Sequence, residues 1–294
     1  MNWIRPEYLL RPSQILRRLA YGLGLTKNKA RATTPWRLPV TFDPTELHGR
    51  AMLTLGLSDL RTNEIISRVV RSGDIAIDIG ANIGIMTSLM AVRAGRTGDV
   101  YAFEPHPDTR ARLEKNVKIW SESGENVAQV SVLPYAVSDT SGHAQLFEPA
   151  YFSVNSGVAT LESDGDGVKS DECYFDVQLI VLDDWLKESE AVRLIKIDVE
   201  GHEDAVLRGM KALLTEKRVE YLLFEEHRPL PSPATDFLKN LGYKSYMVDR
   251  TFCSPLLLDV EAQPPSLRGE ATNVVSMLES NTTDKLCQRG WTVL

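Results

Sequence analysis

The sequence contains little cysteine and no long apolar run. Only three of its 294 residues are cysteines, they are widely separated, and no C-x-x-C pair occurs. We therefore expect neither a disulfide framework nor a cysteine-bound zinc site, and the composition suits a reducing, cytoplasmic setting. No apolar run approaches the roughly 18 residues that a membrane-spanning helix requires. The 43% hydrophobic content supports a substantial core, in one large α/β domain with additions or in two small domains.

Positive charge is scarce outside the beginning of the chain. The formal net charge is −7, yet residues 1–42 hold eight basic residues and one acidic residue, which leaves 25 basic and 39 acidic residues in 43–294. An acidic body repels phosphates, so we expect no nucleic-acid substrate. These charges divide the chain into a basic, partly helical leader at 1–42 and a main domain at 43–294.

The leader places apolar and basic residues close together. Leu16, Leu19 and Leu23 interleave with Arg17 and Arg18. A helix of this kind could make weak contact with an anionic membrane surface, which would make the protein membrane-peripheral. An ordinary leading helix with solvated arginines is the alternative that we favour. The two arginines interrupt the apolar run, so the segment is a poor signal peptide.

The most informative motif lacks a glycine. Residues 74–87, DIAIDIGANIGIMT, have the alternating isoleucines of a buried strand, then a glycine turn and the start of a helix. Gly80 and Gly84 permit a sharp bend, but Asn82 occupies the middle glycine position of the dinucleotide fingerprint. Asp78 at the strand end would also repel a pyrophosphate. A sulfonium cofactor has no phosphate and carries positive charge, so the loop favours S-adenosylmethionine over NAD.

The next predicted strand supplies a second candidate for cofactor binding. It ends in Glu104, twenty residues beyond Gly84. A carboxylate at this position can accept hydrogen bonds from both ribose hydroxyls of a nucleoside. This feature serves NAD as well as S-adenosylmethionine, so the choice between the two depends on the glycine loop.

Strand and helix patterns alternate along the main domain, which predicts a mostly parallel, doubly wound α/β sheet. Residues 43–60 are interpreted as a short extended segment, and the irregular stretch 140–178 as a lid or insertion. We expect strands at 75–79, 100–104, 127–137, 194–198, 220–225, 244–249 and 273–279, further strands at 144–148 and 174–181, and helices at 62–72, 109–120, 203–215, 234–241 and from the glycine loop to about 94.

Acidic residues crowd the carboxyl ends of two predicted strands, 194–198 and 220–225. The cluster comprises Lys196, Asp198, Glu200, His202, Glu203, Asp204, Glu225, Glu226 and His227. A carboxylate or His227 could take a proton from an acceptor hydroxyl. Acids with His227 could instead hold a divalent cation, but no defined ligand spacing supports this, and we predict no metal site. In the third interpretation, Glu203 and Asp204 only stabilise a helix amino terminus. Lys196 is better explained as an ion-pair partner than as a Schiff-base nucleophile.

Several of these motifs resemble the FkbM family of S-adenosylmethionine-dependent methyltransferases. The resemblance covers roughly residues 60–250 and is strongest in the last of three long motifs. These are AIDIGANIG at 76–84, AFEPHP at 102–107 and IKIDVEGHE at 195–203, with LDDWL at 182–186 and AVSD at 136–139 in support. The family implies a class I Rossmann-like sheet with an antiparallel last strand, and O-methylation of a hydroxyl on a sugar, glycan or natural product.

The resemblance also implies roles for individual residues. The methionine part of the cofactor would be cradled by Asp78, Gly80, Asn82 and Gly84. Glu104 would hold the ribose, and Asp139, or the backbone near Ala136 and Val137, would lie by the adenine. The transferred methyl or the acceptor would face Asp198, Glu200 and Glu203.

Asp198 is our candidate for the base or for the group that orients the acceptor, with Glu200 and His227 as alternates. The expected partner is a small-molecule or glycan acceptor. Two other functions stay open on the sequence: an NAD-dependent oxidoreductase, and a non-catalytic module that binds a nucleoside. The substituted glycine disfavours the first, and the dense acidic edge disfavours the second.

Overall fold

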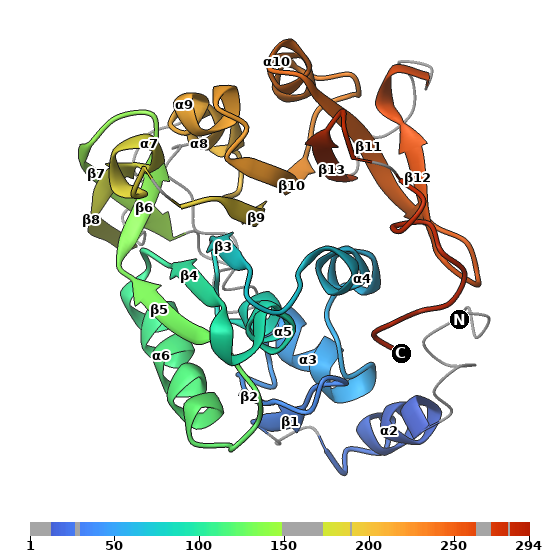
Figure 1. Cartoon of the computed structure of the whole chain (residues 1–294). Helices are drawn as coiled ribbons and strands as arrows, with labels where there is room; N and C mark the ends of the chain where they lie inside the picture. Colours follow the sequence, from blue (N-terminus) through green and yellow to red (C-terminus); the bar gives the residue numbers. More distant parts are fainter. Residues whose placement is uncertain (1–12, 27–29, 149–172, 189, 263–271, 282) are drawn as a thin grey trace.

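The computed structural model describes residues 13–26, 30–148, 173–188, 190–262, 272–281 and 283–294, and an eight-stranded sheet forms its centre (Figure 1). The strand order is β12-β11-β13-β10-β9-β3-β4-β5. The strands are β3 (Ile75–Ile79), β4 (Asp99–Phe103), β5 (Gln129–Leu133), β9 (Val192–Ile197), β10 (Val219–Glu226), β11 (Tyr243–Arg250), β12 (Pro255–Asp259) and β13 (Thr272–Leu278). Strands β5, β4, β3, β9 and β10 are parallel, whereas β13 runs antiparallel to both β10 and β11. The predicted class I sheet with an antiparallel last strand is confirmed.

Helices cover both faces of this sheet, so alternate residues of each strand enter two separate cores. The helices are α2 (Ser13–Gly22), α3 (Leu47–Thr54), α4 (Leu60–Val69), α5 (Ile85–Ala94), α6 (Pro107–Ser121), α7 (Leu182–Trp185), α8 (Glu203–Arg208), α9 (Lys211–Thr215) and α10 (Pro233–Asn240), with short 3-10 helices at Gly95–Thr97 and Val260–Ala262. Ala76 of β3 packs with α4 and α5, whereas Ile77 and Ile79 pack with the face covered by α7 to α10. Strand β3 is thus buried on both sides, as its isoleucines predict.

The described residues before β3 pack against the main sheet and its helices. A hairpin of β1 (Arg31–Thr33) and β2 (Pro39–Thr41) packs against α6, where the indole of Trp120 donates a 2.7 Å hydrogen bond to the carbonyl of Pro39. The predicted extended segment at 43–60 is wrong, because it contains α3 and the start of α4. Its short apolar run fits either a helix or a strand, and tertiary burial of Met52 and Leu53 selects the helix.

A second sheet of three strands stands beside the carboxyl edge of the first. It has the order β6-β8-β7, with β6 (Tyr135–Ser138), β7 (Gly142–Glu148) and β8 (Cys173–Val181). The single strand predicted at 127–137 is therefore wrong: Pro134, which lacks an N–H, separates β5 in the large sheet from β6 in the small one. Strands β7 and β8 confirm the two short strands expected there, while the centre of the predicted lid, 149–172, lies outside the described residues.

The helix predicted at 203–215 is divided into α8 and α9. Gly209 lies between them, and a Cβ there would stand 2.0 Å from the carbonyl oxygen of Ser138. Close approach to β6 therefore interrupts the helix. Across the described residues, no helix is both long and apolar enough to cross a membrane.

Candidate active site

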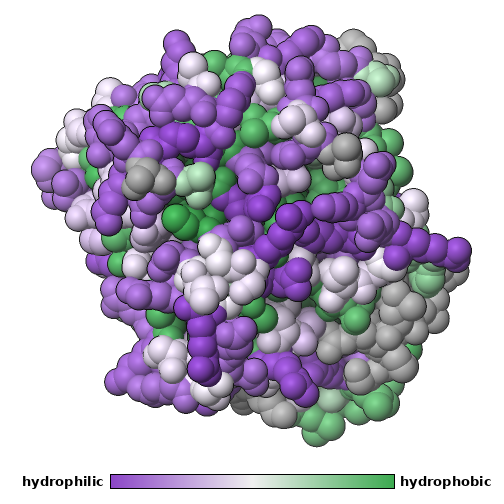
Figure 2. Space-filling model, in the orientation of Figure 1, coloured by the Kyte–Doolittle hydropathy of each residue, from purple (hydrophilic) through white to green (hydrophobic). Residues whose placement is uncertain are grey.

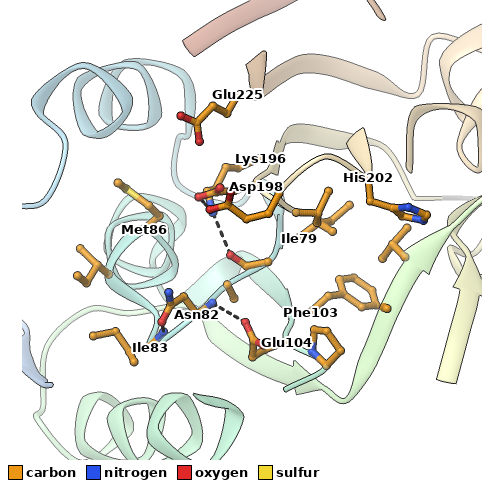
Figure 3. Close-up of a pocket in the computed structure, with 18 of the residues that line it drawn as sticks. Ile79, Asn82, Ile83, Met86, Phe103, Glu104, Lys196, Asp198, His202 and Glu225 are labelled. Carbon is orange, nitrogen blue, oxygen red and sulfur yellow. Dashed lines mark hydrogen bonds and ion pairs between the residues drawn. The ribbon is translucent and has the colours of Figure 1, made fainter. Parts of the chain in front are cut away.

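A cavity of about 330 Å³ opens at the carboxyl ends of β3, β4 and β9 (Figure 3). This edge of a doubly wound sheet is where ligands bind in folds of this class. The polar part of the lining comes from Gly80, Asn82, Glu104, Asp198, Glu200, His202, Glu225, Lys196, His48 and Ser58, and the apolar part includes Ile79, Met86, Phe103, Tyr135, Ala136, Val137 and Leu146. We call this space the first cavity.

The loop after β3 is held in an unusual backbone conformation. Gly80 has φ of 74°, and a Cβ at this position would lie 1.9 Å from the carbonyl oxygen of Asp198. Asn82 is also left-handed, with φ of 49°, which asparagine tolerates better than most residues. Its side-chain oxygen accepts a 2.7 Å hydrogen bond from the N–H of Ile83. Strained loops of this kind are typical of ligand sites.

Glu104 closes β4 at the wall of the first cavity. Its two carboxylate oxygens accept hydrogen bonds from the backbone N–H of Asn82, at 2.8 Å, and from that of His106, at 3.0 Å. The residue is only 7% exposed, and this burial raises the pKa of Glu104 to about 7, although the two N–H donors act in the opposite direction. A buried carboxylate with hydrogen-bonding capacity toward a cavity suits the two hydroxyls of a ribose.

Lys196 joins the loop to β9 from within the sheet. Its ammonium lies 3.1 Å from the carboxylate of Asp78, 3.2 Å from that of Asp198 and 3.1 Å from the carbonyl oxygen of Gly80. Parallel pairing places Lys196 opposite Asp78. Burial alone would lower the pKa of Lys196, but Asp198 and Asp78 outweigh it and the pKa is raised. A lysine that stays protonated confirms the ion-pair interpretation.

Five of the residues that were assigned a role in the site from the sequence lie outside the lining of the first cavity: Asp78, Gly84, Asp139, Glu203 and His227. Asp78 is fully buried and accepts a 2.6 Å hydrogen bond from the hydroxyl of Thr87. A Cβ on Gly84 would meet α6 instead of a ligand, at 2.4 Å from Leu113. Asp139 is exposed and bonded to Arg208, which lowers the pKa of Asp139. His227 is exposed beyond the end of β10.

The turn after β9 gathers acids with different surroundings. Glu200 lines the first cavity with a left-handed φ of 50°, and burial followed by repulsion from Asp198 and Glu225 raises its pKa to about 7. Glu203 is buried and accepts hydrogen bonds from backbone N–H groups of its own turn, including Gly201 at 3.1 Å. Asp204 forms a two-bond ion pair with Arg228, at 2.7 and 2.8 Å. Glu203 and Asp204 thus stabilise local structure.

A second cavity of about 330 Å³ adjoins the first, and sequence analysis missed most of it. It shares His48, Ser58, Met86, Lys196, Asp198 and Glu225 with the first cavity and adds residues that include Ala51, Asp59, Thr62 and Asn273. These come from α3, the start of α4 and β13, which are far apart in the sequence. A lone histidine in a segment expected to be extended carried no signal that could have found His48. Within the described residues, no group of three or more histidine, cysteine or acidic side chains is arranged to hold a metal ion.

Comparison with known proteins shows the family to which the chain belongs. The family model described as "Methyltransferase FkbM domain" matches residues 78–245, more than half of the chain. The chain belongs to the FkbM methyltransferase family. Its cofactor is S-adenosylmethionine, the methyl donor that the sequence favoured over NAD. The family assignment also confirms the resemblance carried by the three motifs.

Individual relatives of this FkbM methyltransferase domain share 30% or less of its sequence. The hexuronic acid methyltransferase AglP of Haloferax volcanii is 30% identical over 177 residues, which span 58% of this chain and 65% of that protein, less than two thirds of its length. Among solved structures, the FkbM methyltransferase of Methylobacillus flagellatus KT is 15% identical, with a TM-score of 0.42 over 90% of this chain and 60% of that one. An rRNA methylase structure from Clostridium thermocellum, itself assigned provisionally, is 10% identical, with a TM-score of 0.42 over 74% of this chain and 93% of that one.

Proposed function

We propose that the protein transfers a methyl group from S-adenosylmethionine to a hydroxyl on a sugar, glycan or related natural product. The observation that carries the proposal is the first cavity of this FkbM methyltransferase. The cavity combines the left-handed loop at Gly80, the buried carboxylate of Glu104 and, on the opposite side, the acids Asp198, Glu200 and Glu225. The relative AglP methylates a hexuronic acid, which supports a carbohydrate acceptor. The acidic main domain disfavours nucleic acid.

The residues of the first cavity fit the three parts of the cofactor. Gly80 and Asn82 would hold the methionine part, with Asp78 and Gly84 positioning the loop from beneath. Glu104 would accept hydrogen bonds from the ribose. Ala136 and Val137, which line the cavity beside Phe103, would cover the adenine, and Asp139 would act there only through the adjoining backbone.

The cofactor supplies an activated methyl group on a cationic sulfur, and the chain has to align an acceptor oxygen with it. Alignment of this kind can supply roughly 7–11 kcal/mol of the barrier. Asp198 is half-exposed in the cavity and held by Lys196, so we assign it the role of accepting a hydrogen bond from the acceptor hydroxyl. Glu200 would assist from the same turn. His227 lies outside the cavity lining, and we give it no direct part.

Calorimetry with S-adenosylmethionine tests the cofactor assignment, and Asp78→Ala should weaken the binding. NADH, tested in the same cell, should not bind. Radiolabelled S-adenosylmethionine, incubated with the protein and a glycan and small-molecule extract, should then label an alkali-stable methyl ether. Preference for NADH, or unchanged affinity in Asp78→Ala, would refute the pocket. Label found in an alkali-labile methyl ester would refute methylation of a hydroxyl.

The sequence alone favoured an ordinary leading helix, but the exposure of its leucines leads us to propose instead that α2 contacts anionic membrane surfaces weakly. Leu16, Leu19 and Leu23 are exposed by 69%, 50% and 76%, and Arg17 and Arg18 lie among them. Figure 2 shows hydrophobic residues at the lower edge of the molecule, where α2 lies in Figure 1. The protein should sediment with phosphatidylglycerol vesicles but not with phosphatidylcholine vesicles, and the double variant Leu16→Ser, Leu19→Ser should lose this binding. Equal sedimentation of variant and wild type would refute the contact.

A further inference from the structure

The second cavity adjoins the first, and the two share part of their lining. His48 of α3 and Glu225 of β10 line both cavities, as do Lys196 and Asp198 of the β9 edge. In Figure 3, Glu225 and Asp198 both lie on the side of the first cavity away from Glu104. A molecule in the second cavity would therefore reach the far side of the cofactor site, where an acceptor has to be.

We propose that the second cavity holds the methyl acceptor, a polyhydroxylated molecule without a carboxylate, and that His48 takes the proton of the reacting hydroxyl. This inference rests on the proposed function, because it assumes that the first cavity holds S-adenosylmethionine. It narrows the acceptor to neutral or amino-bearing polyols and adds a residue that lies outside the matched family domain at 78–245.

The charges of the second cavity select against an anionic acceptor. Among the described residues, its lining includes the carboxylates of Asp59, Asp198 and Glu225 and, as the one ammonium, that of Lys196. Lys196 is already held by Asp198 and by the buried Asp78. A hexuronate would bring another negative charge into this space, where the described lining residues offer no cation beyond the paired Lys196. Sugar hydroxyls, in contrast, can donate hydrogen bonds to these carboxylates, and an amino group can pair with them.

Glu225 contributes hydrogen-bonding capacity to this wall of the second cavity. It is half-buried at the end of β10 and lines both cavities. Burial, with repulsion from Asp198, raises the pKa of Glu225. Asp59 differs, because it caps α4 and receives a 2.9 Å hydrogen bond from the amide of Asn273. Asp59 is thus engaged within the protein, whereas Glu225 and Asp198 line both cavities.

His48 has both the position and the neutral form that a base requires. Burial lowers the pKa of its imidazole, and Lys196 acts in the same direction, while Asp198 and Glu46 oppose them. Glu46 is itself paired with Arg112, at 2.6 Å. The net lowering keeps His48 neutral at pH 7, so a ring nitrogen can accept a proton.

The proposed step balances without a further reactant. The acceptor oxygen forms a bond to the methyl carbon, and the carbon–sulfur bond breaks with its electron pair remaining on sulfur, which loses its positive charge. The hydroxyl proton passes to His48, and the imidazolium then releases it to solvent. Asp198 stabilises the imidazolium through its opposite charge.

Ligand-observed NMR tests the acceptor site without relying on turnover. Methyl β-glucoside, glucosamine and glucuronic acid are each added to the protein saturated with S-adenosylhomocysteine. The first two should show saturation transfer and glucuronic acid should not. Ala51→Phe, which fills the second cavity from α3, should abolish the transfer while calorimetry finds the cofactor product bound within about twofold of wild type. Preference for glucuronic acid, transfer from none of the three, or survival of binding in Ala51→Phe would overturn the assignment. If the wild-type protein does not bind S-adenosylhomocysteine, the proposed function is refuted instead.

His48→Asn tests the base, with His143→Asn as the matched control because His143 is an exposed histidine on β7. His48→Asn should lower kcat for the bound probe by about 10²–10⁴-fold, while KM and cofactor affinity stay within about twofold and the control is unchanged. Histidine NMR of the wild-type protein should show one signal that titrates below pH 6.5 and is missing in His48→Asn. An unchanged kcat in His48→Asn, or a His48 signal that titrates above pH 7, would overturn the role.

Discussion

Burial of Glu104 makes the stability of the fold depend on pH in a direction opposite to that of most carboxylates. Its pKa rises from an ordinary value of 4.5 to about 7 in the folded protein. The folded state therefore holds this proton more tightly than the unfolded chain does. The resulting stabilisation is fully present below pH 4.5, where it amounts to about 3 kcal/mol, and it is lost as the pH rises through 7.

Substitution of Glu104 by Gln removes this titration and leaves the shape of the side chain almost unchanged. From about pH 5.5 to pH 8.5, the Glu104 contribution to the free energy of unfolding should fall by about 2 kcal/mol. Both carboxylate oxygens accept backbone N–H groups, so the amide also costs about 1–3 kcal/mol for one unmatched donor. That cost does not vary with pH, and it cancels when the two pH values are compared within one variant.

Urea denaturation of wild type, Glu104→Gln and Glu114→Gln at both pH values measures this effect. Glu114 is a suitable control because its side chain is 58% exposed on α6. Wild type and the control should lose about 2 kcal/mol more between the two pH values than Glu104→Gln does. Equal pH dependence in all three proteins would show that Glu104 ionises normally, and the assignment of a buried, partly protonated ribose carboxyl would then fail.

Three other substitutions test how the first cavity is assembled. Gly80→Ala should reduce the free energy of unfolding by at least about 2 kcal/mol in urea, because its Cβ would collide with the carbonyl of Asp198; an unchanged midpoint would contradict this packing. Asp78→Asn, by weakening the buried pair with Lys196, should cost up to about 3–5 kcal/mol in the same assay, and a cost near zero would mean that Asp198 alone neutralises Lys196. Asp198→Asn should keep cofactor affinity by calorimetry but lower methyl transfer by about 10²-fold; full turnover would leave Asp198 only a structural role.

The sheet could be predicted because its strands carry strong local signals. Ile77 and Ile79 of β3 and the run Leu194–Ile197 of β9 are buried, so periodicity and burial agree there. The antiparallel last strand came from the family resemblance, and hydrogen bonding of β13 to both β10 and β11 confirms it. Strand β12 was missed because it lies at the edge of the sheet and, among the described strands, pairs with β11 alone.

The candidate site could be predicted only where its residues follow one strand directly. Gly80 and Asn82 follow β3, and Asp198 and Glu200 follow β9, so sequence proximity and spatial proximity coincide. His48 reaches the same cavity from α3, through packing that joins segments about 150 residues apart in the chain. The two glycines of the motif also serve different purposes, which the sequence did not distinguish. The absence of a side chain at Gly80 allows close approach of the Asp198 carbonyl, and its absence at Gly84 allows close approach of α6.

One electrostatic property links the choice of cofactor to the choice of acceptor. The edge of the sheet carries Asp198, Glu200 and Glu225 around one lysine, and burial raises the pKa of both glutamates. Such an edge attracts a cationic sulfonium, which would lower those pKa values on binding, and it repels a pyrophosphate. The same excess of carboxylates extends into the second cavity, where it would repel a uronate.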